Sequence, residues 1–166
     1  MLDDERGVPT STEAHKTLVR RFVEEVQSQG RLEVLDELVA PAFVNHTAPP
    51  GLPSDREGVK QVTLLFRRAF PDGAITVEDM IAEGDTVATR KTFRGTHQGE
   101  FMGIPPTGRH VAIGLIDIVR VVDGRVVEHW NVVDNLGLLQ QLGVLPSPGQ
   151  ATGKTLAGGQ TDADRG

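Results

Sequence analysis

The stretch RHVAIGLIDIVRVVDGRVVEHWNVVD, residues 109–134, decides the fold of this chain, because it has the pattern of two apolar strands joined by a tight turn. The turn is Asp123-Gly124, a dipeptide that favours a two-residue hairpin with positive φ at both positions. Counting back from this turn predicts that Asp117 lies opposite Trp130. Residues two apart on a strand share a face. The register therefore predicts one face that carries these four side chains among apolar neighbours: Asp117, Glu128, Trp130 and Asp134.

The two aspartates of this predicted face suggest acid/base chemistry. A carboxylate among apolar side chains is costly to ionise, so the pKa values of Asp117 and Asp134 are expected to rise. A carboxyl group with a raised pKa is suited to exchanging a proton near neutral pH. The sole tryptophan, Trp130, would then line the same hollow.

Composition excludes several classes of function. The chain has 166 residues, no cysteine and no tyrosine, and a net charge of -6. It therefore has no disulfide, thiol nucleophile or thiolate metal site. No basic block favours nucleic acid or an anionic membrane, and no apolar run approaches the roughly 20 residues of a membrane helix. The polar N-terminal sequence is unlike a secretory signal, so we expect a cytoplasmic protein.

The rest of the chain predicts helices first and strands afterwards. Hydrophobic spacing near 3.6 predicts the helices, and the period then changes to 2. The expected helices cover residues 10–29, 32–39 and 54–70, with a short closing helix over 135–142. The expected strands cover residues 42–47, 74–82, 86–95 and the two arms of the hairpin.

This order predicts an α+β domain, in which three N-terminal helices pack on the concave side of a strongly curved, mostly antiparallel sheet. A bent sheet covered by helices forms a cone whose mouth can hold a small ligand. We expect a flexible N-terminus over residues 1–9, one domain over 10–146 and a disordered tail over 147–166.

Three motifs carry a resemblance to a known family. FVNHTAPPG (43–51), FRGTHQGEFMGIPPTGR (93–109) and IDIVRVVDGRVVEHWNVVDNLGLLQQLG (116–143) resemble the SnoaL-like polyketide cyclases, also called ester cyclases. The resemblance covers residues 14–146. It implies the cone-shaped α+β barrel shared with nuclear transport factor two and ketosteroid isomerase. It also implies ring closure by intramolecular aldol condensation on a hydrophobic small molecule, without cofactor or metal.

The resemblance also implies roles for particular residues. A general acid/base at the end of the last strand falls on Asp134. Asp117 matches a protonated aspartate of the ketosteroid isomerases that holds an oxyanion, and the isomerase base falls near Asn45 and His46. The chain departs from the isomerases in having no tyrosine for the phenol donor of that oxyanion site.

The candidate site combines both lines of reasoning. Four residues are candidate catalytic groups: Asp134, Asp117, His46 and His97. Eight more are candidate substrate-binding residues: Trp130, Glu128, Asn45, Arg90, Phe101, Met102, Ile113 and Leu115. No metal or phosphate-loop motif is present, and the connection over residues 96–108 is either a lid or an ordinary hairpin loop.

Each main candidate also has a structural alternative. Asp134 directly precedes a helix and could be its N-cap, and Asp117 could form a buried ion pair with an arginine such as Arg90 or Arg94. Trp130 could be a core residue. His46 and His97 could be structural.

The preferred hypothesis is a cofactor-independent cyclase in which Asp134 abstracts a proton next to a carbonyl and a protonated Asp117 binds the enolate oxygen. Two alternatives are a non-catalytic binding module of the same fold and an epoxide-opening enzyme with a relay of Asp117, Asp134 and Arg90 or Arg94. We expect a homodimer by analogy with this fold.

Overall fold

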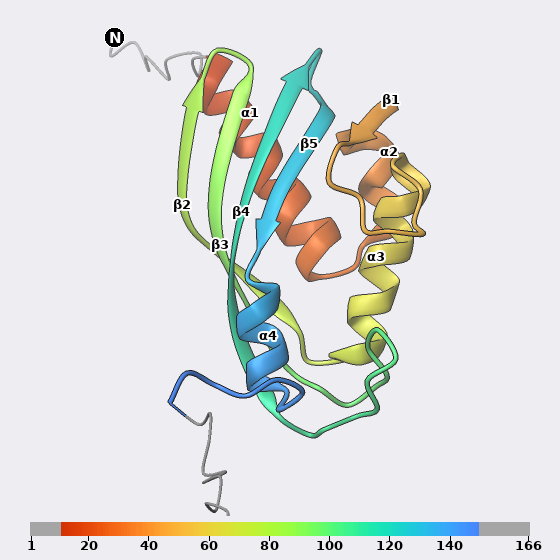
Figure 1. Ribbon diagram of the computed structural model, residues 1–166. Helices are drawn as coiled ribbons and strands as arrows, with labels where there is room; N and C mark the ends of the chain where they lie inside the picture. The colour runs from red at the N-terminus through yellow and green to blue at the C-terminus, as the bar shows by residue number, and fades with distance from the viewer. Residues whose placement is uncertain (1–10, 150–166) are drawn as a thin grey trace, which may run out of the picture.

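One five-stranded sheet forms the scaffold of the protein (Figure 1). The computed structural model describes residues 11–149; the predicted flexible segment 1–9 and residues 150–166 of the predicted tail lie outside this range. The strand order is β1-β5-β4-β3-β2, with β1 parallel to β5 and the other neighbours antiparallel. The strands are β1 (Val39–Asn45), β2 (Ala74–Glu83), β3 (Thr86–Thr96), β4 (His110–Val122) and β5 (Arg125–Val133).

The predicted helices are present, with one change of helix type. The first begins as α1 (Ser11–Arg21) and continues as a π-helix, η1 (Phe22–Ser28). A 3₁₀ turn, η2 (Leu32–Val34), leads into α2 (Leu35–Leu38). The remaining helices are α3 (Arg56–Ala69) and the closing α4 (Asn135–Gln141). Within residues 11–149, no helix combines the length and the apolar character needed to cross a membrane.

The helix α3 begins at a different cap from the one that the sequence suggests. Ser54 and Glu57 match a capping box, but Asp55 is the N-cap, and its side chain accepts hydrogen bonds from the backbone N–H groups of Glu57 (2.9 Å) and Gly58 (3.2 Å). Aspartate is as good an N-cap as serine, so the N-cap lies one residue later than the Ser54 of the capping-box pattern.

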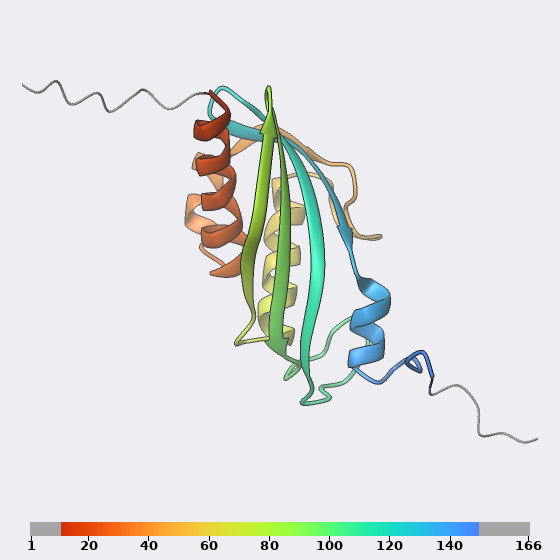
Figure 2. The same cartoon turned by 90° about the vertical axis from the view of Figure 1, so that its left-hand side faces the viewer.

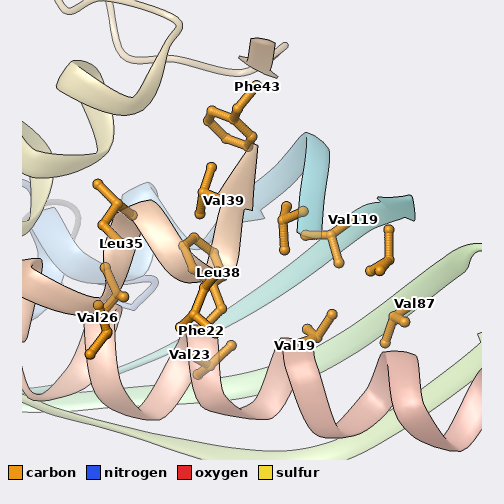
Figure 3. Packing of buried hydrophobic residues seen from close by; sticks show 13 residues of the cluster. Val19, Phe22, Val23, Val26, Leu35, Leu38, Val39, Phe43, Val87 and Val119 are labelled. Carbon is orange, nitrogen blue, oxygen red and sulfur yellow. The ribbon is translucent and has the colours of Figure 1, made fainter. Parts of the chain in front are cut away.

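Two apolar clusters fill the inner side of the sheet. Figure 3 shows the first, in which Val19, Phe22 and Val23 of α1 and η1 face Val87 and Val119 of the sheet. The second cluster lies towards the other end of the strands and contains these buried residues: Ala69, Phe70, Phe93, Phe101, Val111, Ile113, Leu138 and Leu142. The helices α1 and η1 pack on β2, while α4 follows β5 and packs on β4 (Figures 1 and 2).

The central hairpin forms as predicted at its turn, but its register differs. Asp123 and Gly124 have φ of 49° and 70°, as the turn requires. Val121 pairs with Val126, but Arg120 pairs with Glu128, so β5 contains a β-bulge. The predicted register is therefore wrong by one residue beyond the bulge. A shift of one residue exchanges the two faces of a strand.

This bulge separates the residues that were predicted to share a face. Asp117 lies opposite Asn131, and Trp130 lies opposite Ile118. In β4 the odd-numbered residues are buried, apart from the half-buried Leu115, and the even-numbered ones are more exposed, so Asp117 points inward. Trp130 and Glu128 therefore lie on the outward face, and the hollow predicted between Asp117, Asp134 and Trp130 is not formed.

Candidate active site

A buried ion pair between neighbouring strands lies at the centre of the inner face. Lys91 of β3 and Asp117 of β4 are each 2% exposed, and the Lys91 Nζ donates a short hydrogen bond to the Asp117 Oδ2. Both side chains lie between the two apolar clusters, since Val87 and Val119 belong to the first cluster while Phe93 and Ile113 belong to the second. The sheet therefore places a pair of opposite charges between two apolar regions.

The ion pair keeps Asp117 charged. Burial alone raises the pKa of Asp117, but the positive charge of Lys91 and the adjacent His129 outweigh it, so the pKa lies well below its usual range. For Asp117, the prediction of a raised pKa and of a protonated carboxyl group is therefore wrong. The alternative of a buried ion pair is confirmed, with Lys91 as the partner in place of Arg90 or Arg94.

A glutamine from the π-helix contacts both charged groups. The Lys91 Nζ donates to the Gln27 Oε1 (2.8 Å), and the Gln27 Nε2 lies 3.4 Å from the Asp117 Oδ2. A π-helical turn carries one more residue than an α-helical turn, and such turns are frequent at functional sites. Gln27 thus closes the polar cluster from the helical side.

A histidine on β5 extends the cluster towards the sheet edge. The His129 Nε2 lies 3.2 Å from the Asp117 Oδ2, and the His129 Nδ1 lies 3.1 Å from the Asn45 Oδ1. The same Asn45 oxygen accepts the backbone N–H of Thr47 (3.0 Å), so the Nδ1 of His129 is the donor in its contact with Asn45. Asn45 thereby orients the imidazole that faces the carboxylate.

Two buried polar atoms in this cluster have no hydrogen-bond partner. They are the Thr89 Oγ1 and the Asp117 Oδ1, whereas the His129 Nε2 contacts the Asp117 Oδ2. Thr89 pairs directly with Asp117 across the β3–β4 ladder, so these atoms lie in one part of the interior. A buried polar atom without a partner costs about 1–3 kcal/mol. These atoms leave hydrogen-bonding capacity unfilled beside the ion pair.

The structure places Asp134 away from this cluster. Asp134 is exposed and is the N-cap of α4, where its Oδ1 accepts the backbone N–H of Gly137 (2.8 Å). The N-cap alternative is therefore confirmed. Asp134 lines an outward depression of about 510 Å³ together with Arg90, Ile116 and Val132.

Four other candidates lie outside the cluster, on the outward face or in an exposed connection. They are His46, Trp130, Glu128 and Arg90. His46 stacks on Trp130 with ring centroids 4.6 Å apart, and its Nε2 lies 3.0 Å from the Glu128 Oε1. Arg90 is exposed and points away from its neighbour Lys91, as does Arg94. Neither arginine can therefore complete the predicted relay with Asp117.

The 96–108 connection is anchored to the core rather than open. His97 is fully buried, and its Nδ1 accepts the backbone N–H of Thr107 (3.2 Å). Phe101 packs in the second apolar cluster, where its ring centroid lies 5.1 Å from that of Phe66. Met102 is 75% exposed at positive φ. His97 thus fixes the connection from inside, and its Nε2 is a further buried atom without a partner.

The remaining candidates lie on the inner face. Ile113 is buried in the second cluster and Leu115 packs against it, on the same face of β4 as Asp117. Asn45 reaches the cluster through His129. These three residues are the predicted binding residues on the same side of the sheet as the Asp117 carboxylate.

Sequence reasoning missed Lys91, His129 and Gln27. Lys91 had a detectable signal, because it falls in the same alternate positions of β3 as the buried Val87 and Phe93. The predicted register, which lacks the bulge, places His129 on the opposite face from Asp117. Gln27 had no such signal, since its direction depends on the π-helix.

The fold and the site together define a class of protein. A curved, mostly antiparallel sheet, with helices on its inner side and a buried pair of opposite charges between two apolar clusters, is an α+β barrel. Among residues 11–149, no three metal-ligating side chains gather in a group that could hold an ion.

Comparison with known proteins identifies the family. The model of the SnoaL-like polyketide cyclase family matches residues 17–142. The nogalonic acid methyl ester cyclase of Streptomyces nogalater is 31% identical over 69% of this chain and 87% of its own. The aklanonic acid methyl ester cyclase DauD of Streptomyces sp. (strain C5) is 31% identical over 76% of this chain and 80% of its own.

Solved structures agree with this result. IdmH from Streptomyces antibioticus is 45% identical, with a TM-score of 0.69 over 78% of this chain and 98% of its own. TsrD from Streptomyces laurentii is 31% identical, with a TM-score of 0.74 over 82% of this chain and all of its own. The chain belongs to the SnoaL-like polyketide cyclase family and is an enzyme of that family.

Proposed function

We propose that this protein closes a ring in a polyketide-like ester by intramolecular aldol condensation, without a cofactor, and that Asp117 is its general acid/base. The observation that carries the proposal is the free Oδ1 of a buried, ionised Asp117. An ionised carboxylate is the form that can accept a proton. Two curated relatives are cyclases of methyl esters, which supports a substrate of that class.

The proposed reaction balances without any further reactant. The Asp117 Oδ1 takes a proton from a carbon next to a carbonyl group, and the C–H electron pair forms an enolate. The enolate carbon attacks a ketone carbon of the same molecule, so that a C–C bond forms and the ketone oxygen becomes an alkoxide. Asp117 returns its proton to that alkoxide. The ring closes with no net change in protons or electrons.

The apolar clusters on both sides of Asp117 support a flat, largely hydrophobic substrate. Ile113 and Leu115 line the same inner face as the carboxylate. We propose that these side chains hold the ring system, and that His129 and Asn45 orient its oxygens. Asp134, His46 and Trp130 have no part in this proposal because they lie outside the cluster.

The test is turnover of nogalonic and aklanonic acid methyl esters by the wild type and by Asp117→Asn. General acid/base catalysis contributes about 10²- to 10⁴-fold, so kcat should fall by at least about 100-fold while the circular dichroism spectrum stays unchanged. Incorporation of deuterium from D₂O next to the carbonyl of the bound ester separates an enzyme from a binding module. A wild-type protein that binds the esters and exchanges no deuterium contradicts the proposal.

We also propose that the protein is a homodimer joined through the outward face of the sheet. Adjacent strands place apolar side chains there, and Ile81 and Val132 are 68% and 74% exposed. Asp79 and Arg90 occupy one cross-strand row with Ile116. A two-fold axis through such a row can pair each charge with its opposite on the second copy.

The oligomeric state is measured by size-exclusion chromatography with light scattering. Val132→Glu should give a monomer, because it introduces a charge into the proposed interface. Leu64→Glu, on the exposed side of α3, is the control that should remain dimeric. A monomeric wild type contradicts the proposal.

A further inference from the structure

The buried His97 holds the 96–108 connection closed through contacts that only a neutral imidazole can make. The His97 Nδ1 accepts the backbone N–H of Thr107 (3.2 Å) and lies 3.0 Å from the Thr107 Oγ1. The Thr107 Oγ1 accepts the backbone N–H of Arg109 (3.3 Å), so its own hydroxyl hydrogen remains for His97. Two donors therefore face the His97 Nδ1, and this nitrogen carries no hydrogen.

The single hydrogen of the neutral ring is consequently on the His97 Nε2, where it has no acceptor in the described structure. His97 is fully buried beside Phe70 of the second apolar cluster, with ring centroids 5.3 Å apart. A buried N–H without an acceptor costs about 1–3 kcal/mol. The closed connection thus carries a cost that contact of this N–H with water would remove.

The turn at the tip of the same connection carries a second cost. Phe101 and Ile104 each donate a backbone N–H to the carbonyl oxygen of the other (3.0 and 2.9 Å), which closes a two-residue turn over Met102 and Gly103. Met102 has a φ of 52°, and a non-glycine residue in this left-handed region costs on the order of 1–3 kcal/mol. The anchors of the connection therefore act against two local costs, so its closed state is poised to open.

We propose that the 96–108 connection is a proton-sensitive strap, which is closed while His97 is neutral and opens when His97 takes up a proton. A second ring proton would have to bind the Nδ1, where the Thr107 N–H already donates, so the closed strap has no place for it. Opening hydrates both ring nitrogens and exposes Phe101, which is buried in the second apolar cluster. This inference concerns the motion of the strap and is independent of the reaction proposed above.

The charged groups around His97 neither balance an imidazolium nor explain a pH dependence near neutrality. Four such side chains lie on the neighbouring segments of the chain: Arg68, Asp72, Arg109 and His110. Asp72 accepts the backbone N–H and the hydroxyl of Thr96 (2.7 Å each), and these hydrogen bonds hold the pKa of Asp72 below its usual range, so it stays ionised near neutral pH. His110 contacts the Thr96 Oγ1 (3.4 Å), and the Arg109 guanidinium donates to a carbonyl oxygen of α4. In the described structure, none of the four has a hydrogen bond or ion pair with the His97 ring.

Hydrogen exchange measured by mass spectrometry tests the strap. The amides of Gln98 and Gly99 donate to the Ala69 carbonyl oxygen in the closed state (2.9 and 3.0 Å), and the Thr107 amide donates to His97. Histidine changes charge between about pH 5 and pH 8, and one proton taken up by the open state shifts an equilibrium by at most about tenfold per pH unit. Between about pH 7.5 and pH 5.5, the protection of these amides, corrected for the intrinsic exchange rate, should fall by about tenfold or more. The amide of Val119, in the first apolar cluster, should keep its protection.

His97→Asn separates the proton from the hydrogen bond. The Oδ1 of the new side chain stands where the Nδ1 stands and accepts the Thr107 N–H, but it takes up no proton. The protection of the strap in His97→Asn should therefore be the same at both pH values. His110→Asn makes the same substitution at an exposed histidine and should keep the pH dependence of the wild type. Wild-type protection that does not change with pH, or a pH dependence that persists in His97→Asn, overturns the proposal.

If His97→Asn does not fold, the wild-type ring itself decides. The ¹⁵N chemical shifts of an imidazole distinguish its two neutral tautomers from the doubly protonated form. We expect the Nε2–H tautomer in the closed strap at the higher pH. A ring hydrogen on the Nδ1, or a doubly protonated ring beside a Thr107 amide that is still protected at the lower pH, overturns the proposal.

Discussion

Lys91 and Asp117 form an ion pair between adjacent strands, with side chains that are 1% and 3% exposed. Two charges so far from solvent depend on each other, since each loses its hydration and receives the other as a partner. The pair joins the two apolar clusters of the inner face into one interior. Substitutions that remove one charge or both measure how much this pair contributes to the free energy of unfolding.

The first prediction concerns the stability of this pair. Lys91→Met and Asp117→Leu should each lower the free energy of unfolding by about 3–5 kcal/mol, because each leaves one buried charge without a partner. The double variant should lose much less, since it replaces the pair with apolar groups of similar size. Urea denaturation of the four proteins gives the coupling energy. Losses that simply add in the double variant contradict the prediction.

The second prediction concerns the free energy of unfolding at acidic pH. The pKa of Asp117 is lowered in the folded state, so its contribution to stability is fully present above the unfolded pKa of about 3.9 and is lost as the pH falls through the folded pKa. The free energy of unfolding should therefore fall below about pH 4. This fall should be less steep in the Lys91→Met/Asp117→Leu double variant. Urea denaturation between pH 3 and pH 7 measures both slopes, and equal slopes would show that Asp117 does not contribute.

The third prediction concerns Asp134 as a helix cap. Asp134→Ala should lower the free energy of unfolding by about 1 kcal/mol, because it removes the acceptor for the Gly137 N–H. Asp134→Asn keeps an acceptor and should keep the stability. Neither variant should change kcat, since Asp134 is exposed and lies outside the buried cluster. A loss of turnover in the stable Asp134→Asn protein would show that the Asp134 carboxylate takes part in catalysis.

The fourth prediction concerns the anchoring of the 96–108 connection. A Cβ at Gly99 would lie 2.2 Å from the carbonyl oxygen of Arg68, so Gly99→Ala must displace the backbone. We expect a loss of about 1–3 kcal/mol in the free energy of unfolding, as for other overpacked sites. Gly114→Ala is the control, because a Cβ there meets nothing within 4 Å. Thermal denaturation of both variants tests the difference, and equal stabilities would contradict it.

The sequence by itself determined the elements and the architecture. Hydrophobic periodicity located the helices and strands, and Asp123-Gly124 fixed the turn of the central hairpin, because these signals depend on neighbouring residues only. The three motifs pointed to the correct family. The burial of Asp117 could also be predicted, since it lies in phase with Ile113 and Val119.

Only the tertiary structure decided which residues meet. One extra residue in β5 turns Trp130 and Glu128 outward and His129 inward. The local sequence has no signal that predicts this bulge. The partner of Asp117 comes from another strand and Gln27 comes from a π-helix, so their meeting depends on sheet register and helix geometry. A strand has two faces and a period of two, which is why one inserted residue exchanged the members of the site while the fold stayed as predicted.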